Sequence, residues 1–143
     1  MGKDKQTKIK ATARKIEAAY NILSGADYKG IDTKEKIALI KLTSKLGNVV
    51  EPLRKLRDDA YKRLQPKNFE EIARKMQCGE TLTPAENFAY TKFDKDLSEC
   101  MAEELDKVHE INADLLSADT FTKLIDCNDF KVGQAALLME VIA

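Results

Sequence analysis

The chain has 143 residues, of which 43% are hydrophobic and 34% are charged, with no tryptophan and three prolines. This length fits one domain, 1–143, and the composition is typical of long solvated helices, so an all-β fold is excluded. The net charge is zero, yet residues 1–64 contain 16 lysines and arginines against 8 acids, and residues 65–143 contain 8 against 16. A basic half and an acidic half predict complementary surfaces, which meet within one chain, between copies or with different partners.

The first predicted helix covers about Thr7 to Leu23. Apolar residues recur there at steps of three and four, the spacing of one helix face: Ile9, Ala13, Ile16, Tyr20 and Leu23. The basic residues before it are followed by neither the apolar run of a signal peptide nor a membrane span. We therefore expect a cytoplasmic protein without membrane association.

The second predicted helix covers Thr33 to Leu64. Asp32 is placed to cap it, with Glu35 three residues later, as in a capping box. Its apolar seam keeps a three-four alternation typical of coiled coils: Leu39, Leu42, Leu46, Val49, Leu53, Leu56 and Ala60. Lysines and arginines flank this seam, so we expect it to pair with an acidic helix.

A short linking helix is predicted from Phe69 to Gln77, between a break at Gln65–Asn68 and Gly79. Thr83-Pro84-Ala85-Glu86 is a strong start signal for a long acidic helix from Pro84 to about Leu116. Its expected buried residues are Phe93, Leu97, Met101, Leu105, Val108, Ile111 and Leu115. The predicted fold is all-α: a long antiparallel, coiled-coil-like helical hairpin with an N-terminal helix, a short linking helix and an apolar C-terminal helix.

The tail differs in character from the long helices. Thr120 to Ile125 are rich in β-branched and aromatic residues, which favours strand, Cys127 to Asp129 indicate a turn, and Gln134 to Ile142 form a very apolar helix. That helix must be buried against the hairpin or a partner. The candidate interface residues are Leu137, Leu138, Met139, Val141 and Ile142. Together with Ile37, Ile40 and Val50, they predict a homo-oligomer, most simply a dimer.

No residue pattern indicates catalysis, cofactor binding or a metal site. His109 is the sole histidine, and helical neighbours Asp106 and Glu110 favour a solvated, lightly paired role. The acidic pair Glu103-Glu104 lacks the histidines of a carboxylate bundle site. The cysteines are odd in number and widely spaced, as in a reduced cytosolic protein, and Cys100 is expected to lack a nearby cation or base and to be buried. We therefore expect a protein that is not an enzyme.

The stretch Lys36 to Leu64, KIALIKLTSKLGNVVEPLRKLRDDAYKRL, resembles a group of short uncharacterised proteins encoded in bacteriophages and prophages. Val50, Pro52, Leu53, Arg57, Asp58 and the segment Phe121 to Ile142 look like the features of that group. The region Phe69 to Leu82 is an insertion relative to it. The resemblance implies a phage or prophage origin and a helical architecture, with no catalytic residues to carry over.

Three functions are considered. The first is a non-enzymatic interaction or oligomerisation protein with an unknown protein partner, as an accessory of phage assembly or host takeover. The second is a coiled-coil holdase, which exposed apolar residues at the hairpin tip would favour. The third is a nucleic-acid-associated regulator that uses the basic segment Lys3 to Lys15, ranked below the others because no nucleic-acid-binding motif is present.

Overall fold

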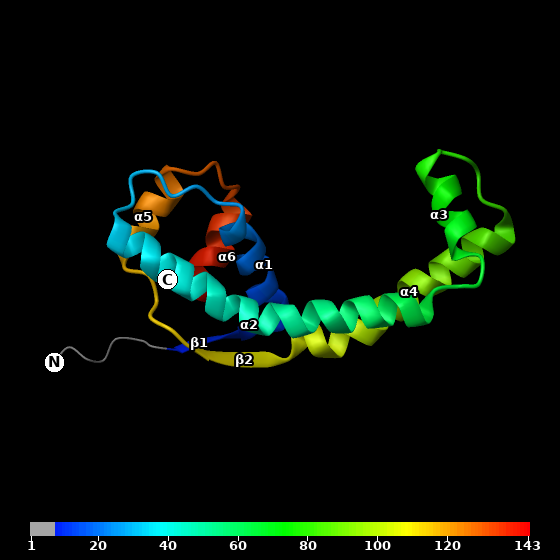
Figure 1. Ribbon diagram of the computed structural model, residues 1–143, viewed down its shortest axis with the longest axis horizontal. Coiled ribbons are helices and arrows are strands. Elements are labelled where there is room, and N and C mark those ends of the chain that lie inside the picture. Colours follow the sequence, from blue (N-terminus) through cyan, green and yellow to red (C-terminus); the bar gives the residue numbers. More distant parts are fainter. Residues whose placement is uncertain (1–7) are drawn as a thin grey trace. The chain divides into compact units, whose positions relative to one another are not determined.

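The computed structural model of the protein describes residues 8–143. Helices make up 71% of these residues, which confirms the expected predominance of helix. Figure 1 labels the elements, which in chain order are β1 (Lys8–Thr12), α1 (Ala13–Ser24), α2 (Thr33–Leu64), α3 (Phe69–Gln77), α4 (Pro84–Asp106), β2 (Val108–Asn112), α5 (Ala118–Asp126) and α6 (Val132–Ile142). The bounds of α2 and α3 agree with those predicted.

The elements group into two compact units. Unit 1 contains the described residues up to Pro52 together with Leu105–Ala143, and unit 2 is Leu53–Glu104. The helices α2 and α4 each contribute residues to both units. The change from basic to acidic composition after residue 64 therefore falls inside unit 2 and does not mark a boundary of either unit.

The first strand corrects the predicted N-terminal helix. β1 pairs antiparallel with β2, so that Ile9 lies opposite Ile111 and both isoleucines are buried, whereas Lys8 and Lys10 are exposed. This alternate burial is the period of a strand. The Thr12 side chain accepts a hydrogen bond from the Lys15 amide (3.3 Å) and caps α1, which begins only at the next residue. The helix predicted from Thr7 is thus wrong for residues 8–12, and Thr7 itself lies outside the described residues.

The second strand corrects the predicted long acidic helix, which ends at Asp106 rather than near Leu116. The Ala13 amide donates to the Lys107 carbonyl (2.9 Å), which continues the strand pairing by one residue. In this register Ile111 faces the core, while Val108, expected to be buried in a helix, is 57% exposed. The three-residue step between these two positions suits a helix face, but in a strand it places them on opposite faces.

The strand character predicted for Thr120 to Ile125 is also wrong, because these residues lie in α5. Ser117 caps that helix by accepting a hydrogen bond from the Thr120 amide (3.2 Å). Phe121 and Leu124 are three residues apart and both buried, which is the spacing of a helix face. The apolar C-terminal helix, α6, is present as expected and begins two residues earlier than predicted.

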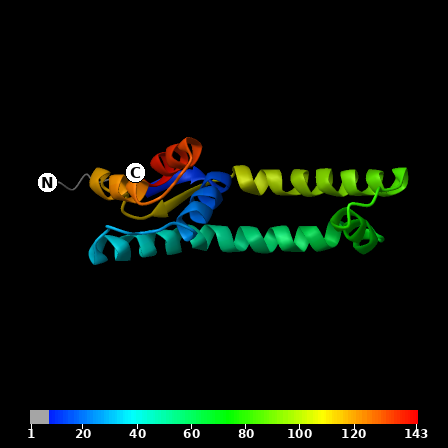
Figure 2. The ribbon, with the colours of Figure 1, turned by 90° about the horizontal axis from the view of Figure 1, so that it is seen from above.

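The core of unit 1 is built from helices that pack on one face of the two-stranded sheet, the face that carries Ile9 and Ile111. Figure 2 shows α1 between the first part of α2 and α6. The largest fully buried side chains of this core come from five elements, β1, α1, α2, α5 and α6: Ile9, Ile16, Leu23, Leu39, Leu46, Val50, Leu124, Leu138 and Ile142. The seam predicted along α2 is buried at five of its seven positions, Leu39, Leu42, Leu46, Leu53 and Ala60, but Val50, not Val49, is the buried valine.

Unit 2 is held by aromatic rings from three helices. The Tyr61 ring of α2 lies 5.5 Å from Phe69 of α3 and 5.3 Å from Phe93 of α4, and Phe69 and Phe93 are 5.1 Å apart, all edge-on. Such pairs contribute about 0.5 to 1.5 kcal/mol each beyond the area they bury. Ile72 and Met101 are buried in the same unit, whereas Leu56, predicted in the seam, is 47% exposed.

The start of α4 carries the capping box that the sequence predicts. The Glu86 amide donates to Thr83 Oγ1 (3.1 Å), and Glu86 Oε1 accepts from the Thr83 amide (2.9 Å) and from Lys75 Nζ (2.8 Å). Glu86 is only 8% exposed. The bond from Lys75 first, and then that from the Thr83 amide, lowers the pKa of Glu86, and the same ion pair raises the pKa of Lys75.

Candidate interaction groove

The predicted interface residues of α6 divide between core and surface. Leu138, Val141 and Ile142 are at most 3% exposed and belong to the core of unit 1, Leu137 is half-buried, and Met139 is 57% exposed. The Ile142 carbonyl accepts a hydrogen bond from the Leu116 amide (2.8 Å), which fixes the end of α6. The apolar tail is therefore buried, as expected, within its own chain, and of the five residues Met139 is the most exposed.

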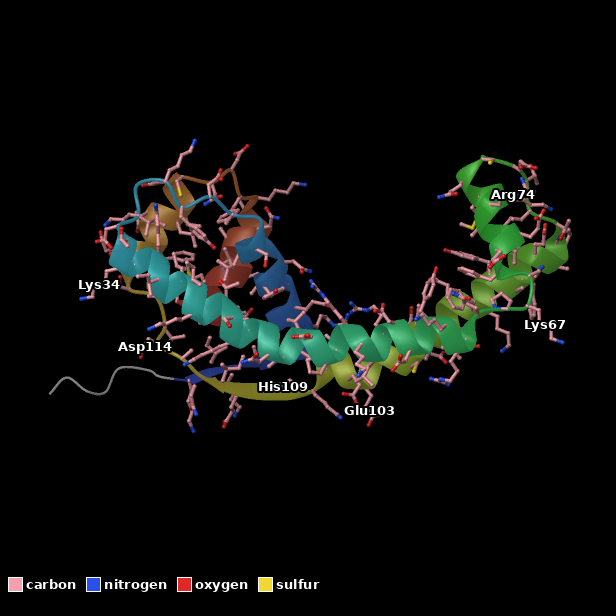
Figure 3. All side chains as sticks on the ribbon, viewed as in Figure 1. Lys34, Lys67, Arg74, Glu103, His109 and Asp114 are labelled. Atoms are coloured by element: carbon pink, nitrogen blue, oxygen red, sulfur yellow. The ribbon has the colours of Figure 1, made fainter. Side chains whose placement is uncertain are left out.

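A groove of about 360 Å³ lies in unit 1 between the first part of α2 and the extended segment 113–117 that joins β2 to α5. The α2 wall is set by the capped start of the helix, where the Glu35 amide donates to Asp32 Oδ1 (2.8 Å). Its residues recur on one helix face: Lys34, Ile37, Ala38, Lys41, Leu42 and Lys45. Figure 3 labels Lys34 and Asp114, one from each wall.

The segment 113–117 is held in place from both ends. Lys45 Nζ donates to the Asn112 carbonyl (2.7 Å), and the Leu116 amide donates to α6 as described above. Leu115 and Leu116 add apolar surface to the groove, and Thr120 closes one end. Sequence reasoning placed residues 113–116 in a helix, so this wall of the groove was not predicted.

The charge of the groove is mainly positive. Lys34 and Lys41 are exposed, and their side chains make no ion pair or hydrogen bond with any residue in 8–143. Glu35, in contrast, is engaged by Lys123 (3.4 Å), which also contacts Asp119 (3.3 Å). The hydrogen bonds from Lys123, to Asp119 first and then to Glu35, raise its pKa. The α2 wall thus presents ammonium groups that lack partners within the described chain.

Two isoleucines of α2 are unusually exposed for their size: Ile37, in the groove, is 48% exposed, and Ile40, one turn along, is 60% exposed. Both were expected to supply apolar area beyond one helical seam, and the structure confirms their exposure. Val50, expected with them, is buried. Large apolar side chains grouped on a charged helix mark a surface that a partner can cover.

Three of the cations that precede the groove residues in the sequence are paired within unit 1. Lys8 lies 3.9 Å from Glu110, Arg14 3.3 Å from Asp106, and Lys15 2.7 Å from Glu140. These are pairs between the basic and acidic halves of one chain. Exposed pairs of this kind contribute about 0 to 1 kcal/mol each. These ion pairs engage three cations of the basic segment Lys3 to Lys15, which was considered for nucleic-acid binding. Residues 3–7 of that segment lie outside the described residues.

The cysteines and the histidine differ in part from expectation. All three cysteines are free thiols; Cys78 and Cys100 are exposed and Cys127 is half-buried. The expected burial of Cys100 is wrong, because its side chain is exposed on α4, and the expected absence of a nearby cation is also wrong, because Arg63 Nη2 lies 3.5 Å from its sulfur. His109 is half-buried on β2, opposite Ala11, and not on a helix between Asp106 and Glu110.

Two features are absent from residues 8–143: a metal-binding cluster and a membrane-spanning helix. No group of three or more histidine, cysteine or acidic side chains is arranged there to hold a metal ion. Within the same residues, none of the helices combines the length and apolar character needed to cross a bilayer.

Unit 2 exposes apolar side chains of its own. Phe88 on α4 is 71% exposed, and Met76 on α3 is 46% exposed. Neither belongs to the aromatic cluster that holds the unit. Both belong to unit 2, whereas the residues that line the groove belong to unit 1.

Comparison with known proteins found no matching family model, no similar curated protein and no similar solved structure.

Proposed function

We propose that the protein is a non-enzymatic helical interaction protein that binds a protein partner and associates with itself, as an accessory of phage assembly or host takeover. The groove beside Ile37 and Ile40 carries this proposal. Full burial of a side chain of this size contributes about 1.5 to 3 kcal/mol, so a partner that covers both gains appreciable affinity. The resemblance of Lys36 to Leu64 to phage and prophage proteins supports the biological setting.

The proposal includes the long antiparallel hairpin of α2 and α4. Its support lies in unit 2, where Tyr61 near the end of α2 contacts Phe93 of α4, and the chain between them returns through α3. Opposite charges on the two helices would select this pairing more than stabilise it. We also propose a cytoplasmic location, which the three free cysteines support.

Affinity capture from cells that express the protein tests the partner. The bait is the full chain, compared with an Ile37→Asp/Ile40→Asp variant, whose charges oppose burial of this surface. The matched control is Val132→Asp, at a residue of unit 1 that is 87% exposed and outside the groove. We expect a protein retained by the wild type and the control and lost by the double variant. Equal retention by all three would contradict the proposal.

Light scattering tests the self-association, for which a dimer is the simplest closed form. We expect a particle of about twice the 16.1 kDa chain at micromolar concentration. A monomer throughout the micromolar range would contradict the oligomer.

A holdase is the second candidate, because exposed Phe88 and Met76 provide an apolar surface in unit 2. We expect the wild type to suppress light scattering by a heat-denatured enzyme, and Phe88→Ser/Met76→Ser to suppress it less. Val132→Ser is the control. Suppression that is equal for all variants, or absent, would remove this candidate.

A further inference from the structure

We infer that the groove of unit 1 takes an acidic, amphipathic helical segment of a partner protein, with two carboxylates seven residues apart that pair with Lys34 and Lys41. This inference rests on the proposed interaction function and specifies the chemistry of the partner. It excludes a basic or a purely apolar occupant.

The charge of the α2 wall supports an acidic occupant. Lys34 and Lys41 have no partner among the described residues, whereas the one carboxylate on the same helix within the groove, Glu35, is already engaged by Lys123. The opposite wall carries Asp114, which is exposed and would face the side of the occupant turned away from α2. An anionic segment therefore meets more favourable charges along α2 than a cationic one does.

The spacing of these groups supports a helical occupant. Lys34 and Lys41 are seven residues apart, about 10.5 Å along a helix axis, and Ile37 and Ala38 lie between them on the same face. A neighbouring helix matches this pattern with acids at positions i and i+7 and apolar residues at i+3 and i+4. In an extended chain, residues on one face recur about every 6.8 Å, which does not bring two carboxylates to this separation.

The chain itself offers no such segment. Five pairs of acids are seven residues apart in the sequence, and in none of them are both intervening positions apolar: Glu51 and Asp58, Asp96 and Glu103, Glu99 and Asp106, Glu103 and Glu110, and Asp119 and Asp126. A different protein is thus favoured over a second copy as the occupant.

The test measures fluorescence anisotropy of a labelled, Ala-rich 18-residue helical probe that carries two glutamates seven residues apart with leucines at i+3 and i+4. Two further probes replace the glutamates by glutamine or the leucines by serine. The proteins are the wild type, Lys34→Glu/Lys41→Glu, and the control Lys55→Glu/Lys62→Glu. The control reverses two exposed lysines that are also seven residues apart on α2, but outside the groove.

We expect the acidic probe to bind the wild type and the control alike, and to bind Lys34→Glu/Lys41→Glu at least about tenfold more weakly, since two attractive pairs become repulsive. The glutamine and serine probes should bind the wild type more weakly than the acidic probe. A probe with lysine in place of glutamate should regain affinity for Lys34→Glu/Lys41→Glu.

No binding at about 1 mM acidic probe, equal binding of the glutamine probe, or equal loss in both double variants would overturn the inference. Failure of the proposed function would give a different result from failure of this inference. If affinity capture retains a partner through Ile37 and Ile40 but the acidic probe does not bind, the interaction stands and its acidic chemistry is wrong. If capture retains nothing through these isoleucines, the interaction function itself is wrong. Dissociation of the protein oligomer by the acidic probe, measured by light scattering, would show that a second copy occupies the groove, which also overturns the inference.

Discussion

The ring of Tyr20 in α1 lies against the backbone of Gly47 in α2, so close that a Cβ atom on Gly47 would be 3.0 Å from Tyr20 Cε1 and 3.6 Å from Cζ. Glycine in a helix interior costs about 0.5 to 1 kcal/mol relative to alanine. Here it lets the aromatic ring cover the helix backbone. The stability of unit 1 therefore depends on the fit between these two residues.

A first prediction follows for Gly47→Ala. The gain in helix propensity should be cancelled by displacement of the Tyr20 ring, so the free energy of unfolding should not rise. In a Tyr20→Ala background the same substitution should add about 0.5 to 1 kcal/mol, because the ring is gone. Gly133→Ala, where an added Cβ has no neighbour within 4 Å, is the control and should not depend on Tyr20. Urea unfolding measures the free energy of unfolding of each variant. The same gain for Gly47→Ala with and without Tyr20 would contradict the prediction, because it would show that displacement of the Tyr20 ring costs no free energy.

A second prediction compares adjacent residues of α6. Leu138→Asp places a charge where the side chain is fully buried, and removal of a leucine alone costs about 2 to 5 kcal/mol. We expect more than about 3 kcal/mol of destabilisation, or loss of soluble protein. Met139→Asp changes a residue that is 57% exposed, so its free energy of unfolding should lie within about 0.5 kcal/mol of the wild-type value. Equal melting temperatures for the wild type and Leu138→Asp would contradict the core described here.

A third prediction concerns the pH dependence of unit 2. The folded-state pKa of Glu86 is lowered, so its ion pair with Lys75 stabilises the fold above the ordinary carboxyl value of 4.5, and this stabilisation is lost as the pH falls through the lowered pKa. Lys75, whose pKa is raised, stays charged throughout this range. Glu86→Gln keeps an oxygen for the Thr83 amide but removes the charge. Its deficit in unfolding free energy should be constant near neutral pH and shrink below pH 4.5.

Urea unfolding between pH 7 and pH 3 measures this difference. Glu70→Gln, at an exposed position of α3, is the control. A deficit for Glu86→Gln that stays constant down to pH 3 would show that the ion pair with Lys75 does not stabilise the unit.

A fourth prediction concerns thiol reactivity. Cys78 and Cys100 are exposed, whereas Cys127 is half-buried and its sulfur contacts the Asp27 carbonyl (3.2 Å). With a thiol reagent that releases a chromophore, the native protein should show two fast equivalents and one slow equivalent. Cys127→Ser should abolish the slow phase and leave the fast one. Three fast equivalents in the native protein would place Cys127 at the surface.

Local signals in the sequence allowed prediction of where the long helices begin. Asp32 and Thr83 cap α2 and α4 through hydrogen bonds from the amides of residues only three positions away. The local sequence therefore contains both partners of each capping bond, and the helix starts can be predicted from it. The strands could not be predicted in the same way. The pairing of Ile9 with Ile111 joins residues about a hundred positions apart, and both also fit helical spacing. These residues form strands rather than helix because the two segments pair with each other in the folded chain.

The groove was partly visible in the sequence. Ile37 and Ile40 were identified as apolar residues outside the seam of α2, which is the signal of a surface with a further role. The opposite wall was hidden, because the residues from Ala113 to Leu116 continue the helical spacing of the acidic segment before them. Only the end of α4 at Asp106 and the strand that follows bring this segment beside α2.

The pairing of β1 with β2 also orders events during synthesis. Unit 2 is one continuous stretch, Leu53–Glu104, so all the residues that make its internal contacts are present once this stretch has left the ribosome. Unit 1 must wait, because its first strand remains without its partner until Val108–Asn112 has emerged, and its core stays open until α6 follows. A premature stop between Glu104 and α6 would therefore release a chain with a formed unit 2 and an unfinished unit 1, and the exposed core residues of unit 1 would make this chain a target for proteases.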